Sequence, residues 1–157
     1  NPDQPLKAED TMTFLDRVFL IHDIGGVKNA LAKETLERYI HDQEHWAYYP
    51  MMSMGARLSE TTLQALAQLE GQPISRELLA QVLFEATGEQ LPQKEAPMMY
   101  TDIEQSAYKE AIGYCVATGL LQGTSDDKMS PNKELTRAEM AMVLQRLDTL
   151  ISLFESK

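Results

Sequence analysis

Hydrophobic residues recur at three- and four-residue intervals along most of the chain, which is the spacing of one face of an α-helix. No segment shows the strict apolar–polar alternation of a half-buried strand, so the sequence predicts an all-α protein. The predicted helices cover about residues 11–24, 31–40, 45 onward, 59–71, 75–88, 107–119 and 136–151.

Local signals mark where several of these helices begin and end. Ser59, Ser75 and Thr136 precede apolar stretches and are typical N-cap residues, while Gly71 and Gly119 are typical stops. Pro50 is expected to end the third helix soon after it starts. The segment 89–97, with two prolines, is predicted to be a linker.

Two sequence patterns recur with nearly the same offset, which indicates internal repetition. Residues 73–80 (PISRELLA) are echoed by residues 134–141 (ELTRAEMA), and more faintly by residues 30–36. Upstream, residues 42–48 (DQEHWAY) are echoed by residues 102–108. Tandem two-helix units would produce this arrangement.

The last unit resembles a known family, the S-layer homology repeat. The resemblance rests on Tyr100-Thr101-Asp102-Ile103, the loop GLLQG at 119–123, Ser130-Pro131 and the segment LTRAEMA at 135–141. The resemblance implies three repeats packed as a pseudo-threefold helical domain. It also implies a non-catalytic module that anchors an exported protein to cell-wall polysaccharide or peptidoglycan, outside the cell or at its surface.

On this reading residues 8–153 form a single domain whose units cover about 8–40, 41–90 and 98–153. Residues 1–7 are expected to be a flexible N-terminal segment. The residues expected to contact wall glycan are Arg137, Thr136, Glu139, Gly123, Asp102, Trp46, Arg76 and Lys33.

Composition narrows the range of partners. The formal net charge is −10 and the sequence pI is about 4.7, so the surface repels nucleic acid and anionic membranes. No apolar run is long enough to span a bilayer, and no membrane insertion is expected. Self-association stays open. Cys115 is the single cysteine and lies in an apolar helical stripe, which favours a buried, inert thiol.

The capping pattern at the start of the last predicted helix does not explain Arg137. Thr136 and Glu139 form the pattern of a capping box, which accounts for them without a ligand. A cation at the first helical position opposes the helix dipole, and Arg76 and Lys33 are expected at the same position in the other units. Either an anionic ligand or a carboxylate of a neighbouring unit would explain these cations.

Two other features allow alternative readings. Trp46, the single tryptophan, suits either core packing or stacking on a sugar ring. The run HDQEH at residues 41–45 matches a zinc-peptidase pattern, but it lacks a third ligand in context, so surface histidines are favoured over catalysis. The sequence predicts no enzyme activity, no metal and no cofactor. The alternative function is a divergent repeat domain that mediates protein assembly at the cell surface.

Overall fold

The computed structural model describes residues 1–22, 24–40, 44, 46–95 and 99–156 of the chain. The described residues form helices and three isolated β-bridges but no sheet, which confirms the all-α prediction. None of the helices in these ranges has the length and apolarity needed to cross a bilayer. The helices are α1 (Ala8–Ile21), α2 (Ala32–Glu37), α3 (Tyr48–Gly55), α4 (Glu60–Ala67), α5 (Arg76–Ala86), α6 (Lys109–Thr118) and α7 (Arg137–Glu155).

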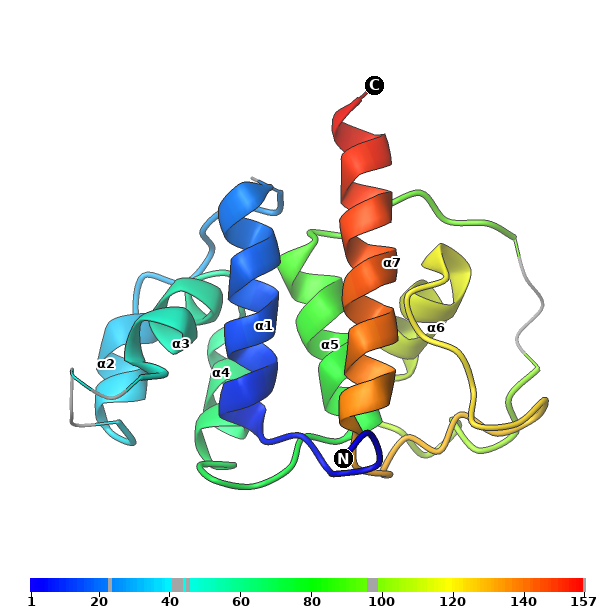
Figure 1. Ribbon diagram of the computed structural model, residues 1–157, viewed down its shortest axis with the longest axis horizontal. Helices are drawn as coiled ribbons and strands as arrows, with labels where there is room; N and C mark the ends of the chain where they lie inside the picture. The colour runs from blue at the N-terminus through cyan, green and yellow to red at the C-terminus, as the bar shows by residue number, and fades with distance from the viewer. Residues whose placement is uncertain (23, 41–43, 45, 96–98, 157) are drawn as a thin grey trace.

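Three helices, α1, α5 and α7, run in the same direction and start at the same end of the molecule (Figure 1). Their preceding residues form a closed ring of backbone hydrogen bonds. The N–H of Leu6 donates to Leu135 O (2.8 Å), Leu135 N–H to Ile74 O (2.9 Å), and Ile74 N–H to Leu6 O (3.1 Å). Because each segment donates to one neighbour and accepts from the other, the three helix starts are related by an approximate threefold axis.

A second ring of hydrogen bonds repeats this pattern at the first residue of each helix. Ala8, Arg76 and Arg137 donate their N–H groups to the carbonyls of Gln72 (3.0 Å), Lys133 (3.0 Å) and Gln4 (3.1 Å). These bonds satisfy backbone donors that a helix start otherwise leaves unpaired. They also establish Ala8, Arg76 and Arg137 as equivalent positions of the three units.

The short helices pack around this central trio. In the structure α6 lies against α5 and α3 lies against α1, while α2 contacts both α3 and α4. In Figure 1, α2, α3 and α4 lie to one side of the three parallel helices and α6 lies to the other. The buried apolar side chains of all seven helices form one continuous core. The ring residues Leu6, Ile74 and Leu135 lie in it, each with no more than 1% of its surface exposed.

The N-terminal segment differs from the flexible tail that the sequence suggested. Its backbone takes part in both rings, Leu6 is buried, and the Ala138 N–H donates to Pro2 O (3.1 Å). The helix that follows begins at Ala8 rather than near Thr11. Periodicity could not reveal this segment because its hydrogen-bond partners, such as Ile74 and Leu135, are far away in sequence.

The local helix signals are mostly confirmed. The hydroxyls of Ser59, Ser75 and Thr136 each accept an N–H from their helix, and Gly119 ends α6 with φ of +84°. Two signals are wrong. Gly71 does not end its helix, because α4 already ends at Ala67. Pro50 lies in the first turn of α3 instead of ending a helix. Proline is tolerated there since the first turn needs no N–H donor.

Candidate functional site

A buried arginine connects α5 to the last unit. Arg76, at the first position of α5, has 2% of its surface exposed. Its guanidinium donates to Met129 O (2.9 Å) and to Gln122 O, and forms an ion pair with Glu139 of α7. Desolvation lowers the pKa of the Arg76 guanidinium below its usual value. The charges of Tyr100 and Asp102 act in the opposite direction but do not outweigh it. These contacts attach the 122–129 loop to the starts of both α5 and α7.

Glu139 has two functions at this junction. Its backbone N–H donates to Thr136 Oγ1 (3.1 Å), and its Oε1 accepts the Thr136 N–H (3.2 Å), which confirms the predicted capping box. The same carboxylate pairs with Arg76 and with Lys133 (3.0 Å). One side chain therefore caps α7 and also neutralises a buried cation.

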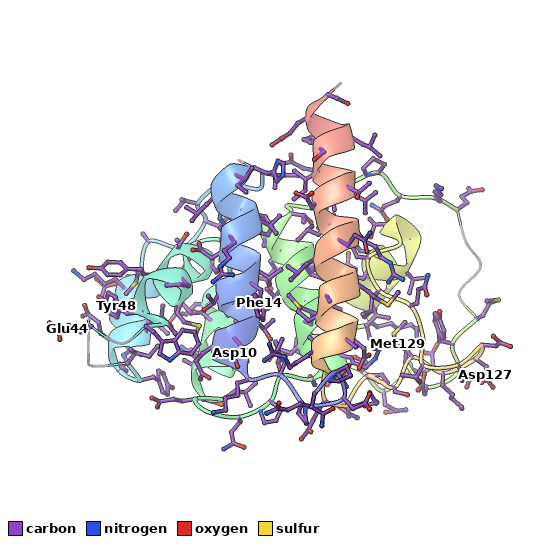
Figure 2. The ribbon with its side chains drawn as sticks, in the orientation of Figure 1. Asp10, Phe14, Glu44, Tyr48, Asp127 and Met129 are labelled. Carbon is purple, nitrogen blue, oxygen red and sulfur yellow. The ribbon has the colours of Figure 1, made fainter. Side chains whose placement is uncertain are left out.

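Asp102 also holds the C-terminal end of the loop. Its two carboxylate oxygens accept the backbone N–H groups of Met129 (2.9 Å) and Ser130 (2.8 Å). Desolvation of Asp102 acts to raise its pKa, but these hydrogen bonds stabilise the carboxylate and the net pKa lies below its usual value. Figure 2 shows Met129 beside the first turns of α7. The loop is thus held in place at the mouth of the site.

Gly123 is the point where the loop passes closest to its surroundings. A Cβ built on it would lie 2.3 Å from the Tyr100 ring and 2.5 Å from Lys128 O. The Gly123 N–H donates to Tyr100 Oη (3.0 Å). Only glycine fits at this point without moving backbone atoms.

These elements enclose a pocket of about 400 Å³. Its charged lining consists of three cations and one carboxylate, which contrasts with the net charge of −10 of the whole chain. Among the residues that the structure describes, Arg146 has no carboxylate within ion-pair distance. The lining residues are Arg76, Leu121, Gln122, Gly123, Thr124, Lys133, Glu139, Met142, Val143 and Arg146.

The loop and the start of α7 lie in the part of the chain that matches a known family. Residues 100–141 match the family model of the S-layer homology domain. This segment of the chain is similar to an S-layer homology domain. Such domains are non-catalytic modules that bind cell-wall polymers, so the match indicates association with the cell surface. No curated protein matches the chain in a sequence comparison.

The pocket brings three of the eight sequence-predicted residues together. Arg76, Gly123 and Glu139 all line the pocket. Arg76 forms an ion pair with Glu139 of the neighbouring unit. Of the two explanations offered for a cation at the first helical position, this is the carboxylate of a neighbouring unit and not the anionic ligand. Thr136 and Asp102 do not line this pocket, but they hold Glu139 and the loop in place.

The other three predicted residues lie elsewhere. Arg137 is exposed at the start of α7 and is not part of the pocket lining. Lys33 was expected to be equivalent to Arg76, but the hydrogen-bond ring gives that position to Ala8. Lys33 instead lies on the surface of α2, 4.0 Å from Glu37. The faint similarity of residues 30–36 to the other two units gave the wrong equivalence for Lys33, because a match of only three residues of similar type arises easily by chance.

Trp46 borders a different hollow. Its side chain is 57% exposed, so the reading as a core anchor is wrong for this tryptophan. The hollow has a volume of about 210 Å³ and is lined by Lys7, Glu9, Ile40, Trp46, Glu70 and Gly71. A contact between Trp46 and sugar stays a prediction.

Lys133, Met142 and Arg146 also line the pocket and are not among the residues predicted from the sequence. The sequence spacing could have identified Met142 and Arg146. They follow Glu139 at intervals of three and four residues, so the three side chains must share one face of α7.

The remaining candidate chemistry lies outside the pocket. The histidines of the run HDQEH, His41 and His45, lie outside the described residues. Within the described ranges, no group of His, Cys, Asp and Glu side chains has the arrangement of a metal site. Cys115 is buried, as predicted, and burial raises the pKa of its thiol.

Proposed function

We propose that the pocket between α5, α7 and the 122–129 loop binds an acidic saccharide group of a cell-wall polymer. The observation that carries the proposal is the local excess of cations in a strongly acidic protein, located where the S-layer homology segment meets α5. A carboxylate such as a pyruvyl ketal or a uronic acid supplies the matching charge.

The cations have different tasks in this proposal. Arg76 is already bonded to two carbonyls and to Glu139, so it positions the loop. Arg146 has the bidentate donor geometry that suits a carboxylate, and Lys133, which pairs with Glu139, adds a further positive charge. Met142, which is 51% exposed, offers an apolar surface for the C–H face of a sugar ring.

Purified cell-wall sacculi test the proposal. The protein is mixed with sacculi that retain their secondary polymers and with sacculi from which acid treatment has removed them, and the sedimented fraction is measured. We expect co-sedimentation with the intact sacculi only, weakened by salt because the contact is ionic. Equal sedimentation with both preparations would shift the target to peptidoglycan. Absence of binding to either would contradict wall binding and favour the assembly module.

A further inference from the structure

A second hollow lies beside the proposed glycan pocket, farther along α7. It has a volume of about 630 Å³, a size typical of a ligand site, and it lies between the end of α6, the last turns of α7 and the linker at residues 92–95. None of its lining residues belongs to the glycan pocket, so it is a separate hollow. The apolar residues that line it are Pro92, Val116, Ala117, Leu150 and Leu153.

One face of α7 forms a wall of both hollows. Glu139, Val143 and Arg146 line the glycan pocket, and Leu150 and Leu153 continue the same face at intervals of four and three residues. At the rise of an α-helix, the wall from Glu139 to Leu153 is about 20 Å long. This length exceeds that of a single sugar ring.

The opposite wall follows the same two hollows in the reverse order of sequence. After α6 the chain runs back toward the end of the molecule where α7 starts (Figure 1). Residues 116–119 line the second hollow, and residues 121–124 line the glycan pocket. Because both walls lead from one hollow directly to the next, the two hollows are parts of one groove along α7.

The charge of the lining changes along this groove. The glycan pocket has three cations against one carboxylate. In the second hollow the charged lining among the described residues is Lys94 and Glu95, which offset each other. Leu153, which is 56% exposed, presents an aliphatic surface to a ligand. A sugar in the second hollow is therefore expected to be uncharged and to carry apolar groups.

The end of α6 adds a hydrogen-bond acceptor to this hollow. The carbonyls of Val116 and Ala117 accept the N–H groups of Gly119 (3.1 Å) and Lys94 (2.9 Å). Within the described residues no N–H group donates to the carbonyl of Thr118, the last residue of α6. The last carbonyls of a helix need partners from outside the helix. A hydroxyl or amide group of a sugar supplies such a donor.

We infer that the groove binds a stretch of several sugars, in which the second hollow is a subsite for an uncharged, acyl-bearing sugar beside the acidic one. The inference rests on the proposed function, because the acidic group determines where the polymer enters the groove. The aliphatic lining suits the methyl group of an acyl substituent and the C–H face of the ring. The protein then selects its polymer by the neighbours of the acidic group as well as by the acidic group itself.

Oligosaccharides of increasing length test the inference. They are prepared from purified secondary wall polymer, separated by size and titrated into the full chain in a calorimeter. We expect fragments of several sugars to bind about tenfold more tightly than the single acidic sugar, because they bury additional apolar surface. Equal affinity of short and long fragments would overturn the second subsite and leave the glycan pocket intact. Absence of binding by every fragment would contradict the glycan pocket itself.

Two matched variants locate the additional contact. Leu153→Ser removes exposed aliphatic surface from the second hollow without adding a charge. We expect it to weaken the binding of long fragments about three- to tenfold and to leave the single acidic sugar unaffected. Leu20→Ser makes the same change at a residue of α1 that is 73% exposed and lies outside the groove, and it should alter neither affinity. An equal effect of the two variants on the long fragments would overturn the inference.

Removal of acyl groups from the long fragments tests the chemistry of the second sugar. Mild alkali cleaves acyl esters, and strong alkali also cleaves acyl amides. We expect the advantage of the long fragments over the single acidic sugar to disappear at one of these steps. Loss at the first step would support an ester, and loss at the second step would support an amide. Long fragments that keep their advantage after both steps would overturn the assignment of an acyl-bearing sugar.

Discussion

Arg76 shows how one buried side chain holds two units together. Its replacement by Ala leaves the carbonyls of Gln122 and Met129 without a donor and removes one partner of Glu139. Because Lys133 still pairs with Glu139, we expect a loss of about 2–4 kcal/mol in the free energy of unfolding, somewhat below the usual cost of breaking a buried pair. Chemical denaturation measures it.

Lys33→Ala is the control for the Arg76 variant. The Lys33–Glu37 pair is solvent-exposed and joins neighbouring turns of one helix, so its loss should cost less than about 0.5 kcal/mol. A comparable loss in the two variants would show that the Arg76 contacts add little stability.

His22 makes the stability of the protein depend on pH. Hydrogen bonds from its two ring nitrogens to Glu155 and Asp148 stabilise the imidazolium and raise the pKa of His22 above its usual value of 6.5. A group with a raised folded-state pKa stabilises the protein most below the unfolded-state pKa, and this contribution is lost as the pH rises through the folded-state pKa. We therefore expect His22 to stabilise the contact between α1 and α7 below pH 6.5 and to lose this effect as the pH rises through its raised pKa.

His22→Gln keeps a hydrogen-bonding side chain but cannot become charged. Thermal unfolding at several pH values should show that the difference in Tm between wild type and variant shrinks as the pH increases above 6.5 and passes through the raised pKa of His22. A difference that is constant with pH would assign His22 to packing alone.

At the scale of elements, the 122–129 loop lines the pocket, and its backbone conformation requires glycine at position 123. Gly123→Ala forces a Cβ against the Tyr100 ring and the Lys128 carbonyl, so the backbone of the loop must shift. We expect a loss of about 1–3 kcal/mol in stability, together with weaker polymer binding. Ser125→Ala changes an exposed residue of the same loop and should affect neither property. Unchanged binding by the Gly123 variant would place the polymer away from this loop.

The helices could be predicted from sequence because their signals are local. Apolar spacing located them, and Ser59, Ser75, Thr136 and Gly119 marked boundaries that the structure confirms. The N-terminal segment escaped because it is held by backbone bonds to residues distant in sequence, which leave no periodic signal.

The candidate site was only partly predictable for the same reason. The motif at the start of α7 identified Glu139 and, through its echo, Arg76, but sequence alone could not show that the two residues form an ion pair. Lys133 and Arg146 join the pocket through the path of the loop and the direction of α7. Equivalence between units was reliable where the hydrogen-bond rings enforce it and failed at Lys33, which lies outside them.

At the scale of the whole molecule, the ring of Leu6, Ile74 and Leu135 makes the units interdependent. Each of these residues belongs to a different unit and is fully enclosed by the other two and the core. Leu135→Ala should therefore cost about 2–5 kcal/mol and lower the stability of all three parallel helices together. Hydrogen exchange tests this: protection should decrease in α1, α5 and α7 alike, and a decrease confined to α7 would show that the units unfold separately.

The proposed binding of an acidic wall polymer depends on the pocket that Arg146 lines. Its most direct test is the affinity of three variants for purified secondary wall polymer, measured by calorimetry. Arg146→Ala should weaken binding by about 1–3 kcal/mol, the usual contribution of a charge-assisted hydrogen bond. Arg17→Ala, which changes the equivalent position of α1, and Arg137→Ala, which changes an exposed cation outside the pocket, should each leave the affinity nearly unchanged. Unchanged affinity in Arg146→Ala combined with a loss in Arg137→Ala would contradict the account and place the polymer on the opposite face of α7.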